Sequence, residues 1–160
     1  MTYASRIKFL GYDFYKSKTG FRMRVHKKVQ AKMRKKVKEL TSRSKVNSFE
    51  GWKESIRRYV VGWTNYYKLA DMGNFLKETD QWMRRRIRMV IWKKWKKPKT
   101  KYKNLRKLGI SHESAYMTAN TSRGYWWVAK TVVINTALSN ERLEKAGYTL
   151  FLPYYRSVCA

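Results

Sequence analysis

The chain has 160 residues, a formal net charge of +28 and a pI near 10.4, which together predict a single domain whose partner is a polyanion. A hydrophobic content of 43%, with seven tryptophans, excludes a disordered basic tail, and the lone Cys159 excludes a disulfide framework. No stretch approaches the roughly 18 consecutive apolar residues of a membrane span, so we expect a cytoplasmic protein with no membrane partner.

The first predicted element is a β-hairpin. Two short alternating runs, residues 7–14 and 21–25, flank residues 16–20, whose composition is typical of a turn. Gly20 is expected to adopt a positive φ in that turn. Because two strands alone are only marginally stable in water, the hairpin is expected to pack on helices or to belong to a larger sheet.

Two amphipathic helices are expected next. In residues 27–44 an apolar stripe recurs every three or four positions on a largely basic surface, through Val29, Met33, Val37 and Leu40. A second helix is expected to begin at Asn47 or Ser48 and to bury an aromatic face. The structural core predicted for this helix consists of Trp52, Ile56, Tyr59, Trp63 and Tyr66.

A third helix is predicted over residues 75–97, ending before Pro98. Its buried face is expected to contain Met83, Ile87 and Val90. Residues 81–108 contain thirteen Lys or Arg and no acid, whereas a solvated helix face normally mixes both signs. We therefore expect contacts with RNA phosphates, here and on the first helix, from Arg84, Arg85, Arg86, Arg88, Lys93, Lys94, Lys96, Lys97, Arg34, Lys35 and Lys38.

The remainder of the chain is predicted to form short helices over residues 102–108, 111–119 and 139–146. Over residues 122–135 periodicity does not separate a helix from a buried strand, and the polar Lys130 and Asn135 favour a helix. Two of the short helices are expected to end at Gly109 and Gly147, because glycine readily takes the left-handed conformation that closes a helix. Ser111 is expected to cap the second of these helices, and Ser139 or Asn140 the last.

No catalytic constellation is visible in the sequence. The ten acidic residues lie mostly on predicted helices among basic residues, so they do not converge as two-metal phosphoryl transfer requires. Glu50 and Glu54 share a helical face, but we expect them to form ion pairs with Lys53, Arg57 or Arg58. The two histidines are far apart, which leaves no metal-ligand cluster. The residues alone therefore predict a binding module with no catalytic residue and no metal site.

Several stretches, taken together and in this order, resemble group II intron reverse transcriptases. Residues 9–12 (FLGY), followed by a short basic hairpin, resemble the last motif of the palm in that family. Further stretches resemble its maturase-specific region, also called domain X or thumb, namely residues 63–67 (WTNYY), 80–88 (DQWMRRRIR), 92–96 (WKKWK) and 123–127 (RGYWW). The similarity covers essentially the whole chain.

The resemblance implies a mainly α fold, a thumb-like helical bundle preceded by a short N-terminal β-hairpin, with residues 1–26 as the end of a palm and residues 27–160 as the maturase-specific domain. It also implies binding of intron RNA for splicing and of the template–primer duplex. The Tyr-x-Asp-Asp motif, the Mg²⁺ and the remaining fingers and palm of an RNA-directed DNA polymerase would lie upstream, so no cofactor is expected in this chain, and the fingers and palm would be a further partner. The alternatives are a free-standing RNA-binding splicing cofactor without polymerase activity and, least favoured, a basic protein of membrane surfaces.

Residue by residue, the resemblance implies RNA contact for Trp82, Arg84, Arg85, Arg86, Arg88, Trp92 and Trp95. It implies packing for Trp63, Tyr66 and Tyr67. Whether Trp126 and Trp127 stack on RNA or pack in the core is left open. Because no acid lies nearby along the chain, only distant acids such as Glu50, Glu54 or Glu78 could neutralise these arginines. Replacing Arg85 and Arg88 by alanine is therefore expected to leave the fold nearly unchanged and to weaken RNA binding by about 1 to 3 kcal/mol.

Overall fold

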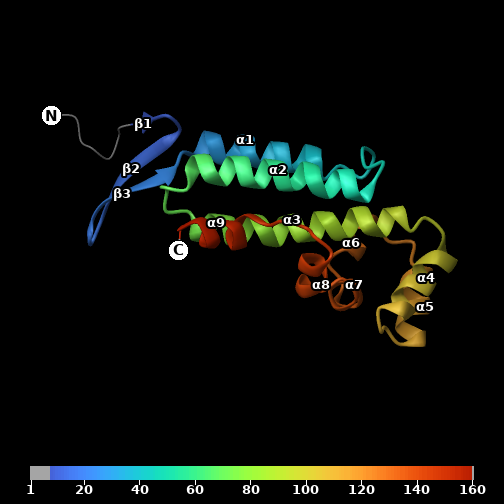
Figure 1. Ribbon diagram of the computed structural model, residues 1–160. Coiled ribbons are helices and arrows are strands. Elements are labelled where there is room, and N and C mark those ends of the chain that lie inside the picture. The colour runs from blue at the N-terminus through green and yellow to red at the C-terminus, as the bar shows by residue number, and fades with distance from the viewer. Residues whose placement is uncertain (1–7, 160) are drawn as a thin grey trace. The chain divides into compact units, whose positions relative to one another are not determined.

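The computed structural model describes residues 8–159, which form two compact units. Unit 1 contains residues 8–40, 54–80 and 149–159, and unit 2 contains residues 41–53 and 81–148. The described residues are mainly α, with three short strands followed by nine helices (Figure 1). Two of the unit boundaries fall within helices, in α2 (Phe49–Tyr67) and α3 (Gly73–Lys94). The division at residue 26 stays a prediction drawn from the resemblance.

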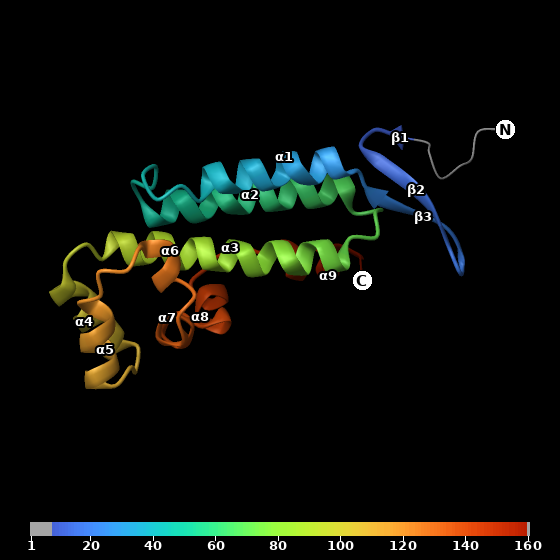
Figure 2. The same cartoon turned by 180° about the vertical axis from the view of Figure 1, so that it is seen from behind.

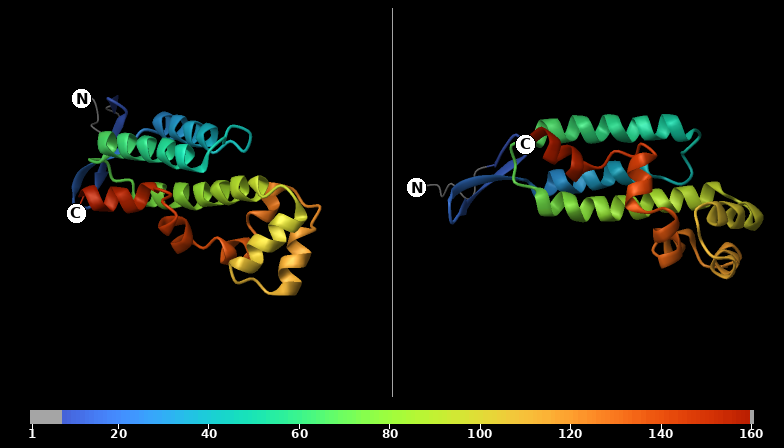
Figure 3. Two further views of the ribbon diagram at one scale, coloured as in Figure 1. Left: turned by 45° about the vertical axis from the view of Figure 1, so that its right-hand side comes forward. Right: turned by 60° about the horizontal axis from the view of Figure 1, so that its bottom comes forward.

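Unit 1 begins with an antiparallel sheet of order β1 (Lys8–Phe9), β2 (Tyr12–Ser17) and β3 (Gly20–Val25), and β3 leads directly into the first helix (Figure 3). β2 and β3 form the predicted hairpin, with Ser17 paired to Gly20 across a two-residue turn and Gly20 at a φ of 123°. The strand predicted over residues 7–14 is instead interrupted at Leu10 and Gly11, whose φ values are 48° and 87°. The first residue of that predicted strand lies outside the described residues.

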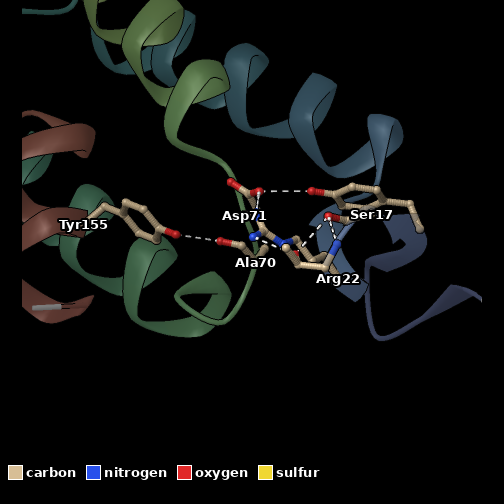
Figure 4. A network of polar contacts seen from close by, with 7 residues as sticks. Ser17, Arg22, Ala70, Asp71 and Tyr155 are labelled. Carbon is tan, nitrogen blue, oxygen red and sulfur yellow. Dashed lines mark hydrogen bonds and ion pairs between the residues drawn. The ribbon is translucent and has the colours of Figure 1, made fainter.

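Asp71, in the turn between α2 and α3, connects this turn to the sheet through hydrogen bonds (Figure 4). The Asp71 carboxylate accepts a hydrogen bond from the Tyr15 hydroxyl at 3.0 Å and another from Arg22 Nη1 at 3.3 Å. In the same unit, Gly11 lies so close to Tyr67 that an added Cβ would sit 2.9 Å from the Tyr67 hydroxyl oxygen. Contacts with the helices therefore stabilise a hairpin that would be marginal by itself.

Unit 1 also contains α1 (Lys27–Leu40) and a helix that is not predicted from the sequence, α9 (Phe151–Cys159). α1 ends four residues before the predicted boundary and buries Met33 and Val37. At the start of α9, the buried carboxylate of Asp80 on α3 accepts hydrogen bonds from the backbone N–H groups of Phe151, at 2.9 Å, and Leu152, at 2.8 Å. A cap supplied from 71 residues away leaves no signal at the helix itself, which explains why α9 is missed.

The aromatic face predicted for α2 is only partly buried in unit 1. Ile56 is buried, whereas Tyr59 and Trp63 are half-buried and meet the Phe151 ring edge-on, at centroid distances of 6.2 and 5.8 Å. Tyr66 does not join the core predicted for it, because it is 56% exposed. It lies in the last turn of α2, where its ring packs against the neighbouring Tyr67 instead.

Unit 2 contains the later turns of α3 and five short helices, α4 (Pro98–Lys107), α5 (His112–Ala119), α6 (Tyr125–Val128), α7 (Val132–Ala137) and α8 (Asn140–Lys145). Figure 2 shows α4 and α5 side by side. Ser111 and Ser139 cap α5 and α8 as predicted, and Gly109 and Gly147 have φ values of 89° and 92° where helices end. The helix predicted over residues 122–135 is divided into α6 and α7, because the Thr131 side chain caps a new helix.

The core of unit 2 contains the three α3 residues predicted for it, Met83, Ile87 and Val90. Trp52, from the first turns of α2, is also buried and meets the Tyr148 ring edge-on at 5.4 Å. No helix among the described residues is both long and apolar enough to cross a membrane.

Candidate nucleic-acid interface

The four arginines of α3 differ in what they contact. Arg88 is only 6% exposed; its Nε donates to the Leu138 carbonyl oxygen at 2.8 Å and its Nη2 to Asn140 Oδ1 at 2.9 Å. Leu138 directly follows α7, so Arg88 supplies donors at the carbonyl end of that helix. The expectation that Arg88 faces RNA is therefore corrected, because its guanidinium is occupied inside unit 2.

Arg86 is also engaged within unit 2. Its Nε donates to Thr41 Oγ1 at 2.6 Å and its Nη2 donates to the Thr41 carbonyl oxygen at 3.2 Å. Thr41 is buried, and burial lowers the pKa of Arg86. The guanidinium also lies 5.3 Å from the ring centroid of Trp82. Arg86 is therefore half-buried and bonded within unit 2, and the RNA contact expected of it stays a prediction.

Arg85 combines two contacts with one residue. Its Nε and Nη2 donate to the Trp126 carbonyl oxygen at 3.2 and 2.8 Å, and its Cζ lies 3.6 Å from the centroid of the Trp126 ring. Trp126 is 37% exposed and the neighbouring Trp127 is 41% exposed, so neither ring is fully packed in the core. Both therefore retain accessible surface of the kind on which nucleobases stack.

Arg84 is the exception among the four. Its Nε is buried and finds no acceptor among residues 8–159. An open pocket of about 310 Å³ brings Arg84 together with Gln81, Lys130 and Asn135. Lys130 and Asn135 are not predicted from the sequence as binding residues, because nothing in the sequence relates them to a helix more than thirty-five positions earlier. The only feature of the sequence that relates two residues of this pocket is that Gln81 precedes Arg84 by three positions, which places both on one face of a helix.

Within the described part of the chain, the distant acids that could neutralise the α3 arginines pair elsewhere, and Glu50 and Glu54 form the ion pairs predicted for them. Glu54 accepts hydrogen bonds from Arg57 Nε and Arg58 Nε, each at 2.9 Å, and these bonds lower the pKa of Glu54 to about 2. The other two distant acids, Glu50 and Glu78, pair with Lys53 and Arg34. Arg85 and Arg88 donate to neutral oxygens rather than to carboxylates.

A basic surface extends from the end of α3 along α4. We define the α3–α4 surface as the nine basic residues of a stretch without acids, namely Lys93, Lys94, Lys96, Lys97, Lys99, Lys101, Lys103, Arg106 and Lys107. None of them forms an ion pair with a residue in the range 8–159. α3 ends at Lys94 rather than at residue 97, because Lys96 adopts a left-handed φ of 42°.

Trp92 lies beneath this surface. It is 1% exposed, and Lys101 Nζ sits 4.6 Å from the centroid of its ring. The RNA contact that the resemblance implies for Trp92 is therefore corrected to a core position. Trp95, which meets the Trp92 ring edge-on at 5.8 Å, is half-buried.

A second basic surface lies on α1 in unit 1. We define the α1 surface as the exposed basic residues of that helix, Lys27, Lys28, Lys32, Arg34, Lys35, Lys36 and Lys38. Arg34 lies 3.9 Å from Glu78 and 5.6 Å from the ring centroid of Phe75, and Lys36 lies 3.9 Å from Glu39. Two long ion pairs at exposed positions neutralise little of this charge.

Residues 8–159 contain no group of three His, Cys, Asp or Glu side chains that could hold a metal ion. The sequence model of a family described as the group II intron maturase-specific domain matches residues 30–109, which is half of the chain. The match includes every residue predicted to contact phosphates and excludes Trp126, Trp127 and Lys130. No curated protein sequence matches the chain.

Proposed function

The chain belongs to the family of group II intron maturase-specific domains, and on this premise we propose that it binds the folded RNA of a group II intron and supports its splicing. The observation that carries the proposal is the α3–α4 surface, where nine basic residues between positions 93 and 107 have no acid among them. Unit 2 as a whole carries twenty Lys or Arg against four acids. The positive charges of such an excess repel one another unless a polyanion binds to them.

On the two basic surfaces we assign the phosphate contacts mostly to lysines and not to Arg85, Arg86 or Arg88 of α3. Lysine places a point charge on a mobile stem, which suits phosphates whose spacing varies over a folded RNA. The proposed contacts are Lys93, Lys94, Lys96 and Lys97 on the α3–α4 surface and Arg34, Lys35 and Lys38 on the α1 surface. Arg85, Arg86 and Arg88 contribute by holding unit 2 in the conformation that presents these lysines.

An RNA template–primer duplex is a second proposed partner of the same surfaces. Proteins bind A-form helices mainly through phosphates and 2′-hydroxyls, and the lysines of the α3–α4 surface need no particular base sequence for such contacts. On this proposal the folded intron and the duplex compete for the chain. A competition assay with a blunt RNA duplex tests this point.

The central test is the salt dependence of intron binding. If about six to eight phosphates are contacted, the logarithm of the affinity should fall with the logarithm of the salt concentration at a slope of roughly −5 to −7. Filter binding or fluorescence anisotropy over a series of KCl concentrations measures this slope. An intron RNA of equal length that cannot fold is the control for recognition of the folded RNA. Anionic vesicles at equal salt are the control for binding that depends on negative charge alone. A flat salt response, or equal binding to the vesicles, would contradict the proposal.

A further inference from the structure

The pocket beside Arg84 is lined by four positive side chains and no acid. Arg84, Arg85 and Arg88 enter it from α3, and Lys130 enters it from the segment between α6 and α7. Gln81 and Asn135 add amide groups to its wall. At about 310 Å³ the pocket is at the lower end of the range for small-ligand sites, so it suits one nucleotide-sized group rather than a duplex.

Among the described residues that line this pocket, Arg84 has a buried side-chain nitrogen without an acceptor. Arg85 and Arg88 donate to carbonyl oxygens, whereas Arg84 Nε is buried and has no acceptor in the described part of the chain. Burying a charged donor without an acceptor is unfavourable, and native proteins rarely contain such a group unless a water or an ion satisfies it. The unsatisfied atom therefore points to a ligand that carries an acceptor.

The electrostatics of the pocket identify the charge of that ligand. Burial lowers the pKa of Arg88, and the nearby charge of Arg84 lowers it further, so the two guanidiniums repel each other. An anion placed between them would offset this repulsion. Because their hydrogen bonds hold Arg85 and Arg88 in place, little further ordering is needed when the anion binds.

We propose that this pocket binds one phosphate group of an unpaired RNA nucleotide, with Arg84 and Lys130 as its direct ligands. A guanidinium matches the geometry of phosphate oxygens, and no lining carboxylate competes for it. Arg85 connects the pocket to the exposed Trp126 ring, on which the base of the same or the next nucleotide stacks. The identity of the phosphate as RNA rests on the proposed function, whereas anion binding by the pocket does not.

The first arm of the test uses inorganic phosphate and the full chain. Phosphate at constant ionic strength should raise the melting temperature of the wild-type chain, and Arg84→Gln should abolish the increase. Lys130→Gln is a second pocket variant, and its position at the surface means that it should fold normally. Lys145→Gln removes the same charge from an exposed α8 position outside the pocket and outside both basic surfaces, and it should respond like the wild type. An equal response in all four proteins would overturn the anion site.

The second arm uses two RNAs, a blunt duplex and the same duplex with a single unpaired nucleotide. Arg84→Gln and Lys130→Gln should each weaken binding of the bulged RNA about tenfold and should weaken binding of the duplex much less. Lys145→Gln should bind both RNAs as the wild type does. Wild-type affinity of the pocket variants for the bulged RNA would overturn the inference while leaving intron binding intact. If the wild-type chain binds neither RNA but responds to phosphate through Arg84, the proposed function fails and the pocket is a site for free phosphate.

Discussion

The Arg85 guanidinium lies 3.6 Å from the centre of the Trp126 ring while it donates two hydrogen bonds to the carbonyl oxygen of the same residue. Trp126 belongs to the short helix α6, whose last carbonyls have no partner within the helix. Arg88 likewise donates a hydrogen bond to the Leu138 carbonyl oxygen at the end of α7. A third arginine, Arg142, donates to the carbonyl oxygens of Leu108 and Ala137, at the ends of α4 and α7. The arginines of unit 2 thus bring donors and positive charge to the negative ends of its short helices.

Replacing Arg88 by alanine is expected to lower the free energy of unfolding by about 2 to 3 kcal/mol, because the buried Leu138 carbonyl loses its charged donor. This reverses the expectation, drawn from the sequence, that Arg85 and Arg88 can be removed without effect on folding. Urea denaturation measures the change. Lys96→Ala, at an exposed position, is the control and should change stability by less than about 0.5 kcal/mol. Wild-type stability combined with weak RNA binding would instead make Arg88 an RNA contact.

Asp80→Ala is expected to destabilise α9 and to cost about 2 kcal/mol of global stability, because two N–H groups at the start of the helix lose their acceptor. Hydrogen exchange at the amides of Phe151 and Leu152 is the measurement, and both should lose protection before the rest of unit 1. Glu144→Ala removes an exposed acid from α8 and is the matched control. Undiminished protection of both amides in Asp80→Ala would show that other contacts hold the helix.

Two tryptophans of the stretches that resemble the family, Trp92 and Trp63, are expected to differ in their contribution to stability. Trp92→Ala should cost about 3 to 5 kcal/mol, because Trp92 is 1% exposed. Trp63→Ala should cost about 2 to 3 kcal/mol, since its half-buried ring contacts the Phe151 and Tyr67 rings but remains partly in solvent. Urea denaturation of both variants, followed by far-UV circular dichroism, gives the comparison. A larger loss for Trp63→Ala would mean that the core of unit 1 is the more sensitive to truncation.

Glu54 gives a prediction about pH. Its hydrogen bonds from Arg57 and then Arg58 lower its pKa from 4.5 to about 2, so the ionised form is favoured in the folded state. The resulting stabilisation is present above about pH 4.5 and is lost as the pH falls through about 2. Glu54→Gln should therefore be slightly less stable than the wild type near neutral pH, and the two urea midpoints should converge at low pH. The difference is small because exposed ion pairs are screened by water.

Replacing Arg57 and Arg58 together by glutamine is the matched control for this effect. It removes both donors while keeping the Glu54 carboxylate, and its urea midpoint should approach that of the wild type over the same pH range. A constant difference between Glu54→Gln and the wild type at every pH would show that the carboxylate acts through packing rather than charge.

The sequence by itself determined the features that depend on neighbouring residues. Helical periodicity located α1, α2 and α3, and the capping serines Ser111 and Ser139 located α5 and α8, because helix formation and capping act over three or four positions. The basic block at positions 81–108 also required no structure, since charge is additive along the chain.

The tertiary structure decided which of those charges remain available to RNA. Arg88 meets Leu138 from 50 positions away, Arg85 meets Trp126 from 41, and Asp80 caps a helix that begins 71 positions later. Hydrogen bonds between such distant residues leave no local pattern, because their geometry exists only once the helices are packed. For the same reason folding divides a run of arginines that reads as one continuous phosphate-binding face. Arg85, Arg86 and Arg88 donate to oxygens within unit 2, whereas the buried Nε of Arg84 has no acceptor among residues 8–159.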